Sequence, residues 1–133
     1  MPSASTLVWD DSLKVGNEVI DHDHKETVEL LAELNAASDA DFHAVFARFA
    51  DHLRDHLARE EDLMRQYGFP PFPIHKHEHD RVRLELQGIE KRLAAGNLML
   101  ARGYAREVVP DWFINHKNTM DSATAAWIKS QGG

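Results

Sequence analysis

Apolar residues recur every three or four positions along four separate stretches of this chain, which is the spacing of one face of an α-helix. No segment alternates apolar and polar residues over the length of a β-strand. The pattern therefore predicts an all-α fold built from four helices. The four stretches cover residues 17–37, 40–67, 69–96 and 98–128.

Residues that start or stop helices stand between these stretches. Ser38 can cap the second helix, and Gly68 ends it. The prolines of "FPPFP" at 69–73 suit the first turn of the third helix, and Gly96 is suited to the C′ position after its last turn. Pro110 lies inside the fourth helix, where it should kink the helix or remove a backbone hydrogen bond.

Short connections between consecutive helices favour antiparallel neighbours, so the expected architecture is an up-down-up-down four-helix bundle. A hydrophobic content of 43% is enough for a real core, and we expect residues 1–133 to form one domain. Residues 1–16 should form an irregular N-terminal arm. Leu7, Val8 and Trp9 are the residues that would pack this arm onto the bundle.

Composition excludes several classes of function. A net charge of −7 without any basic block argues against a nucleic-acid or anionic-membrane partner. The absence of cysteine excludes disulfides, Cys–zinc sites, Fe–S ligation and thiol nucleophiles. The N-terminus lacks the features of a signal peptide, and no apolar run approaches the ~18–20 residues that span a membrane. We expect a soluble, cytoplasmic monomer.

Histidine is unusually frequent, at nine of 133 residues. Helical phase places at least one histidine on the apolar face of every predicted helix, and two helices carry pairs of polar side chains spaced i, i+4 on that face. A single buried histidine is most often a core residue with one hydrogen bond. Five inward imidazoles with an inward carboxylate are much harder to satisfy without a metal ion. The inward residues are His24, His56, Glu60, His75, His79 and His116.

Asp121 is a further candidate, but it lies five residues after His116 and therefore about 140° around a regular helix. Either its carboxylate reaches around to the site, or the helix is locally irregular, for instance through a π-bulge. Otherwise Asp121 would be a solvated acid near a helix end. The same phase argument predicts that the remaining histidines are surface residues. These are His22, His43, His52 and His77.

The order and spacing of these residues resemble the hemerythrin family, specifically its single-domain bacterial members (bacteriohemerythrins). The family motif is H, then HxxxE, then HxxxH, then HxxxxD, with a Trp four residues before the last His. The resemblance covers essentially the whole chain. The matching stretches are "VGNEVIDHDHK" at 15–25, "HLAREEDLM" at 56–64, "YGFP" at 67–70, "HKHEH" at 75–79 and "WFINHKNTMD" at 112–121.

This resemblance implies a non-haem di-iron centre, oxo- or hydroxo-bridged, inside the bundle. It implies that His75, His79 and His116 bind one iron, that His24 and His56 bind the other, and that Glu60 and Asp121 bridge the two. Counting ligands leaves one open position, on the iron with two histidines, where dioxygen would bind. Glu61, next to the bridging Glu60, is expected to point outward by its helical phase and motif position.

The resemblance implies reversible O2 binding for storage or delivery rather than an enzyme activity. An O2 or redox sensor that acts through a partner, and an iron- or peroxide-handling oxidase, remain as alternatives. Ferritin-like di-iron proteins instead use Glu-x-x-His pairs, which are not found here in the inward phase. A single tetrahedral zinc would have too few coordination positions for seven protein ligands.

Two residues depart from the family pattern near the expected O2 pocket. Thr27 stands where an apolar residue is usual, three residues after His24, and Lys117 directly follows His116. A threonine hydroxyl can donate to bound oxygen species, whereas Lys117 could extend its ammonium outward. These departures lead to the hypothesis of a wetter pocket and faster autoxidation to the di-ferric state. An oxygenated spectrum that is stable for hours in air would contradict this hypothesis.

Overall fold

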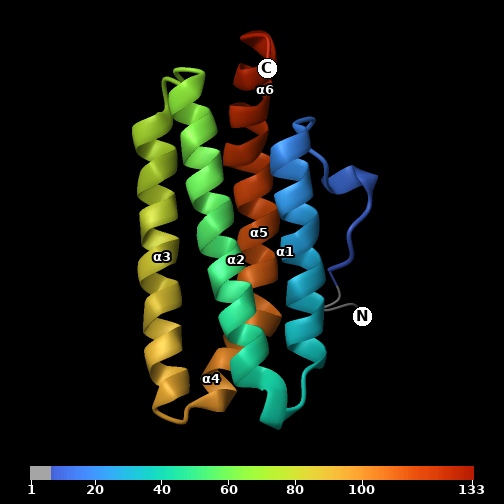
Figure 1. The fold of residues 1–133 in the computed structure, drawn as a ribbon, viewed down its shortest axis with the longest axis vertical. Helices are drawn as coiled ribbons and strands as arrows, with labels where there is room; N and C mark the ends of the chain where they lie inside the picture. Colours follow the sequence, from blue (N-terminus) through green and yellow to red (C-terminus); the bar gives the residue numbers. More distant parts are fainter. Residues whose placement is uncertain (1–6) are drawn as a thin grey trace.

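Four helical rods run antiparallel to their neighbours in sequence in the computed structural model, which describes residues 7–133 (Figure 1). Three rods are the single helices α1 (Glu18–Ala36), α2 (Asp39–Gln66) and α3 (Phe72–Ala94), and the fourth extends from Leu98 to Ser130. The described residues contain no strand. The predicted up-down-up-down four-helix bundle is thus confirmed. Within the same residues, no helix is long and apolar enough to cross a membrane.

The helices end at the residues that the sequence indicated. The Ser38 side chain accepts a hydrogen bond from the backbone N–H of Asp41 at 3.2 Å and caps α2. Gly68 and Gly96 follow α2 and α3 with φ of 61° and 97°, a left-handed conformation that glycine adopts without strain. These stops give short connections, which keep consecutive helices adjacent.

The fourth rod is a continuous helix with two π-helical turns, η3 and η4. The N–H of Val109 donates to the carbonyl of Tyr104, five residues earlier, so a widened turn stands directly before Pro110. A proline ring clashes with the preceding turn of a regular α-helix, and the wider turn accommodates it. The segments are α4 (Leu98–Gly103), η3 (Tyr104–Val108), α5 (Val109–His116), η4 (Lys117–Asp121) and α6 (Ser122–Ser130).

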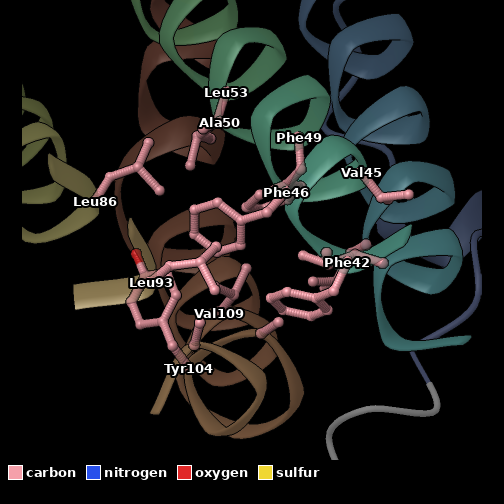
Figure 2. Close-up of a cluster of buried hydrophobic side chains, with 14 of the residues drawn as sticks. Phe42, Val45, Phe46, Phe49, Ala50, Leu53, Leu86, Leu93, Tyr104 and Val109 are labelled. Carbon is pink, nitrogen blue, oxygen red and sulfur yellow. The ribbon is translucent and has the colours of Figure 1, made fainter. Parts of the chain in front are cut away.

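The apolar core lies mainly toward the end of the bundle that holds the α1–α2 and α3–α4 connections. Phe42, Phe46 and Phe49 of α2 meet Leu86 and Leu93 of α3 there, together with Tyr104 and Val109 of the fourth rod (Figure 2). A smaller apolar cluster of Ile20, Ala125 and Ile128 lies nearer the other end. The predicted inward histidines of α1 and of the fourth rod, His24 and His116, fall between these two clusters in sequence.

The described part of the N-terminal arm, residues 7–16, runs alongside α1 and includes a short 3-10 helix, η2 (Asp11–Leu13) (Figure 1). Leu7 packs against the main core as predicted, but Val8 is 73% exposed, so the expectation that it would pack onto the bundle was wrong. Trp9 is half-buried and lines a surface hollow with residues of α1. Residues 1–6 of the predicted arm lie outside the described residues.

Two leucines of α3 provide a matched test of the core. Leu86 is fully buried and Leu84, two residues earlier on the same helix, is 70% exposed. Leu86→Ala should lower the free energy of unfolding of the iron-free protein by about 2–5 kcal/mol, because it removes buried methyl groups and leaves a cavity. Leu84→Ala should change it by no more than about 0.5 kcal/mol. Equal urea midpoints for the two variants would contradict this packing.

Candidate metal centre

All seven candidate ligands lie in the interior of the bundle, and none exposes more than 3% of its surface. Helix α1 contributes one of them, α2 two and α3 two, and the fourth rod contributes the remaining two. Helical phase selected six of these side chains and the family motif added Asp121, and the fold brings all seven together from all four rods. The residues are His24, His56, Glu60, His75, His79, His116 and Asp121.

These side chains form two groups whose ligand atoms lie within 4.8 Å of one another, and the groups share two carboxylates. One group contains three imidazoles and the other contains two. Glu60 and Asp121 belong to both groups, as bridging carboxylates would. The first group is Glu60, His75, His79, His116 and Asp121, and the second is His24, His56, Glu60 and Asp121.

The nitrogen and oxygen atoms within each group are about as far apart as ligands of a common metal ion. Nε2 of His75 lies 2.8 Å from Oε1 of Glu60 and 3.2 Å from Nε2 of His116. Oδ1 of Asp121 lies 3.0 Å from Nε2 of His116, and its Oδ2 lies 2.9 Å from Nε2 of His24. Ligands bonded at about 2.1 Å and at right angles are roughly 3 Å apart, so the donor atoms are spaced for metal coordination.

Hydrogen bonding within the described residues leaves this cluster unsatisfied. In the described part of the chain, seven buried side-chain polar atoms have no hydrogen-bond partner, and four of them are ligand atoms that face the cluster. An unpartnered buried polar atom is costly, and such a concentration of them needs another partner. Imidazole and carboxylate donors suit iron. The donor set therefore fits a pair of metal ions. These four atoms are Oε1 and Oε2 of Glu60, Nε2 of His79 and Oδ1 of Asp121; the Nδ1 atoms of His24 and His116 are also unpartnered, but their rings face the cluster with Nε2.

Without metal ions, the buried acids and imidazoles of the cluster shift one another's pKa values strongly. Burial raises the pKa of Glu60, and the neighbouring charge of Asp121 raises it further. Burial would also raise the pKa of Asp121, but the attraction of His116 and the other imidazoles holds it well below its usual range. Burial alone would lower the pKa of His75, yet the carboxylates of Glu60 and Asp121, 2.8 and 3.1 Å from its Nε2, raise this pKa to about 9. A protonated His75 thus supplies positive charge that a metal ion would replace.

His79 is held in the form that a metal ligand requires. Its Nδ1–H donates to Oε2 of Glu61 at 2.9 Å, which leaves the Nε2 lone pair directed into the cluster. Burial, together with the charge of His75, lowers the pKa of His79 to about 4, so the ring is neutral. Arg83 pairs with the same Glu61 oxygen at 2.7 Å.

The prediction that Glu61 points outward was therefore wrong. Only 5% of its surface is exposed, because α3 covers the side of α2 on which Glu61 lies. The helical position of Glu61 next to Glu60 predicted the side of α2 on which it lies. It could not predict that another helix packs against that side. The sequence did contain one indication of this carboxylate's role. Its two partners, His79 and Arg83, are spaced i, i+4 and therefore lie on the same face of the neighbouring helix.

Loss of the Glu61 carboxylate, which accepts a hydrogen bond from His79, should weaken iron binding without abolishing it. We expect Glu61→Ala to reduce iron affinity by about 10- to 100-fold, because His79 loses the acceptor that fixes its tautomer and orientation. Iron retention against a competing chelator measures the effect. Asp62→Ala, at the exposed next position, is the control and should retain iron like the unmodified protein. An equal loss of iron from both variants would contradict the role of Glu61.

Asp23 supports the other side of the cluster and was not predicted. Its Oδ2 accepts from Nδ1 of His56 at 3.3 Å, and Arg59 holds both carboxylate oxygens at 2.7 and 2.8 Å. Burial would raise the pKa of Asp23, but the bonds from His56 and Arg59 hold it below its usual range. Thr124 Oγ1 similarly lies 2.8 Å from Nδ1 of His75. These contacts cross between helices, so periodicity within one helix gave no sign of them.

The position of Asp121 is explained by the π-helical turn η4. Ser122 N–H bonds to the carbonyl of Lys117, five residues earlier, which widens the turn between His116 and Asp121. Residues five apart then lie closer to one face than in an α-helix. Of the two alternatives left by the sequence, local irregularity is the one observed.

Aromatic rings close the cluster on the fourth rod. The Trp112 ring stacks on His116 with centroids 4.8 Å apart and planes inclined by 20°. Phe113 packs edge-on against His24 at 5.0 Å. Phe113 is buried, so an apolar surface lies directly beside the two-histidine group. This arrangement restricts access of water to that group.

The predictions for the other histidines had mixed outcomes. His22, His43 and His77 are exposed, as predicted. His52 is not, since only 11% of its side chain is accessible. Its Nε2 lies 3.1 Å from both the backbone oxygen of Asp23 and Oγ1 of Thr27. The packing of α1 against α2 covers this position beside the apolar stripe.

The two unusual polar residues have partners away from the ligand cluster. Thr27 donates its hydroxyl proton to the carbonyl of Asp23 at 2.8 Å. Lys117 is buried, and its ammonium donates at 2.6 Å to the side chain of Asn118, an exposed neighbour. The donor that motivated the hypothesis of a wetter pocket is therefore already engaged.

Comparison with known proteins agrees with this geometry. The profile of the family described as "Hemerythrin HHE cation binding domain" matches residues 15–128. A bacteriohemerythrin of Ralstonia nicotianae is 32% identical over 95% of this chain and 91% of its own length. A myohemerythrin of Sipunculus nudus is 26% identical over 90% of this chain and 92% of its own.

A solved structure resembles this one closely in fold. The crystal structure of a hemerythrin point mutant superposes with a TM-score of 0.85 at 22% identity, covering 92% of this chain and 97% of that one. The seven-residue cluster thus lies within a matching fold and a matching family profile. This chain belongs to the hemerythrin family.

Proposed function

We propose that this chain binds dioxygen reversibly at a di-iron centre held by the seven clustered side chains, for oxygen storage or delivery. One observation carries the proposal: two groups of buried imidazoles share the carboxylates of Glu60 and Asp121. Membership of the hemerythrin family supports O2 binding at such a centre. Storage and delivery both require that the gas is released unchanged.

In this proposal the two groups hold one iron each. His75, His79 and His116 bind the first, and His24 and His56 bind the second. Since one group has three imidazoles and the other two, the iron held by His24 and His56 would have fewer protein ligands, and O2 would be accommodated on that side. When bound, the reduced iron pair supplies the two electrons that O2 takes up and later returns.

The chain's own residues fix the ligands and keep water away. Asp23, Glu61 and Thr124 hold the Nδ1 atoms of three ligand histidines, so that each Nε2 lone pair is directed inward. Phe113 supplies an apolar wall beside His24. Because the Thr27 hydroxyl donates its proton to the carbonyl of Asp23, it has no proton to donate to bound O2.

Reconstitution with Fe2+ under anaerobic conditions tests the metal half of this proposal. Metal analysis after desalting should give two iron ions per chain. A single iron, or a preference for one zinc over iron, would contradict it. The visible spectrum before and after O2 is admitted and removed tests the other half.

A further inference from the structure

We propose that His52 of α2 and Glu26 of α1, with His22 at the rim, form a peripheral site for a divalent transition-metal ion. This site is separate from the seven-residue cluster and shares no ligand with it. Ligand atoms of Asp23, Glu26 and His52 lie within 4.8 Å of one another. Since the Asp23 carboxylate is already bound by Arg59 and His56, the free donors are His52 and Glu26.

The tautomer of His52 is set by its buried nitrogen. Nε2 faces two oxygens, the carbonyl of Asp23 and the hydroxyl of Thr27, each at 3.1 Å. The carbonyl can only accept, and the Thr27 hydroxyl proton is already donated to that same carbonyl at 2.8 Å. Nε2 must therefore carry a proton, and in the neutral ring Nδ1 carries a lone pair.

The lone pair on Nδ1 of His52 faces a second hydrogen-bond acceptor, the carboxylate of Glu26. Nδ1 of His52 lies 3.4 Å from Oε2 of Glu26, so in the neutral ring a lone pair opposes a carboxylate. A cation between the two atoms removes this conflict. The pattern also matches the usual support of a metal-binding histidine, whose other nitrogen donates to a backbone carbonyl. His52 makes that bond to Asp23.

Glu26 faces imidazoles with both of its oxygens. Its Oε1 lies 2.9 Å from Nε2 of His22, one helical turn earlier on α1. His22 and Glu26 are 69% and 45% exposed at their side chains, whereas His52 is 11% exposed. The proposed site therefore has a buried inner imidazole, a central carboxylate and a second, exposed imidazole.

The site opens onto solvent. His22, Asp23 and Glu26 line a surface hollow of about 410 Å³ together with Glu18, Val19 and Arg59. Arg59 forms an ion pair with Asp23, so its positive charge is already balanced. The remaining carboxylates of Glu18 and Glu26 give the hollow a negative charge that attracts cations. Two imidazoles and one carboxylate suit ions such as Zn2+, Fe2+ or Ni2+ rather than Ca2+ or Mg2+.

Zinc titration of the iron-loaded protein in its di-ferric state tests the proposal. Calorimetry, with metal analysis of the desalted product, should show one zinc bound per chain in addition to iron. Glu26→Gln should weaken this binding by about tenfold or more, because the central anionic ligand is lost. His52→Ala should do the same. His22→Ala should weaken it to a smaller extent.

Matched controls separate this site from general surface binding. Glu29→Gln removes a carboxylate from the exposed face of the same helix, and His43→Ala removes an exposed histidine of α2. Both should bind zinc like the unmodified protein. If His52→Ala also lost iron, Glu26→Gln would still decide the matter, since Glu26 is outside the iron cluster. Zinc binding that is absent, or unchanged in Glu26→Gln, would overturn the proposal and leave an ordinary ion pair of Glu26 with protonated histidine.

Discussion

Glu60→Gln is expected to abolish binding of both iron ions, which is the largest effect that any single side chain should produce. Glu60 belongs to both ligand groups, so its loss removes an anionic ligand from each iron at once. Glutamine keeps the size and shape of the side chain. The bundle should therefore stay folded, because a neutral amide also avoids the cost of burying a carboxylate whose pKa is raised by burial and by Asp121.

The measurement is iron content after reconstitution, with circular dichroism to confirm helical structure. Glu61→Gln is the matched control at the next position. Its amide oxygen can still accept from Nδ1 of His79, so the protein should keep both irons. Two irons bound as tightly by Glu60→Gln as by the unmodified protein would show that Glu60 does not bridge them.

His79→Ala should have the second-largest effect, with iron content falling well below that of the unmodified protein. His79 is fully buried, and its Nε2 has no hydrogen-bond partner in the described part of the chain. Loss of this imidazole removes one of three from the first iron and also frees Glu61 from its partner. The bridging carboxylates then hold that iron with two histidines.

His77→Ala is the control, because His77 lies on the exposed face of the same helix, two residues away. Its iron content, measured in parallel after the same reconstitution, should be unchanged. Equal iron loss in both variants would mean that the histidine-rich run at 75–79 acts as one polar patch. Equal retention would place the first iron elsewhere.

The inward residues could be predicted because an α-helix has a fixed period. Once an apolar stripe is identified, the face of each histidine follows from its position in the sequence. His75 and His77 illustrate this: they are two residues apart, yet one is buried and the other exposed. The helix ends at Ser38 and Gly96 were predictable for a similar reason, since caps and left-handed glycines act locally.

The contacts between helices could not be predicted in the same way. Glu61 and His52 lie beside the apolar stripe of α2, where burial depends on which neighbouring helix covers them. Helix α3 covers Glu61 and α1 covers His52, and these contacts convert two expected surface residues into partners of buried groups. The period of α2 contains no information about that packing.

The π-helical turn at 117–121 lies between these two cases. The five-residue spacing of His116 and Asp121 indicated that something other than a regular α-helix was needed, but it did not exclude a long reach by the carboxylate. The structure shows a widened turn instead, with Ser122 bonded to the carbonyl of Lys117. Only the backbone geometry decides between the two possibilities.

Reversible oxygen binding is tested most directly by the visible spectrum of the reduced, iron-loaded protein. The protein is reconstituted with Fe2+ without oxygen, exposed to O2 and then returned to an oxygen-free atmosphere. A charge-transfer band should appear with O2, disappear when O2 is removed and return on re-exposure over several cycles. A band that forms once and does not reverse, with conversion to the di-ferric state, would contradict oxygen carriage.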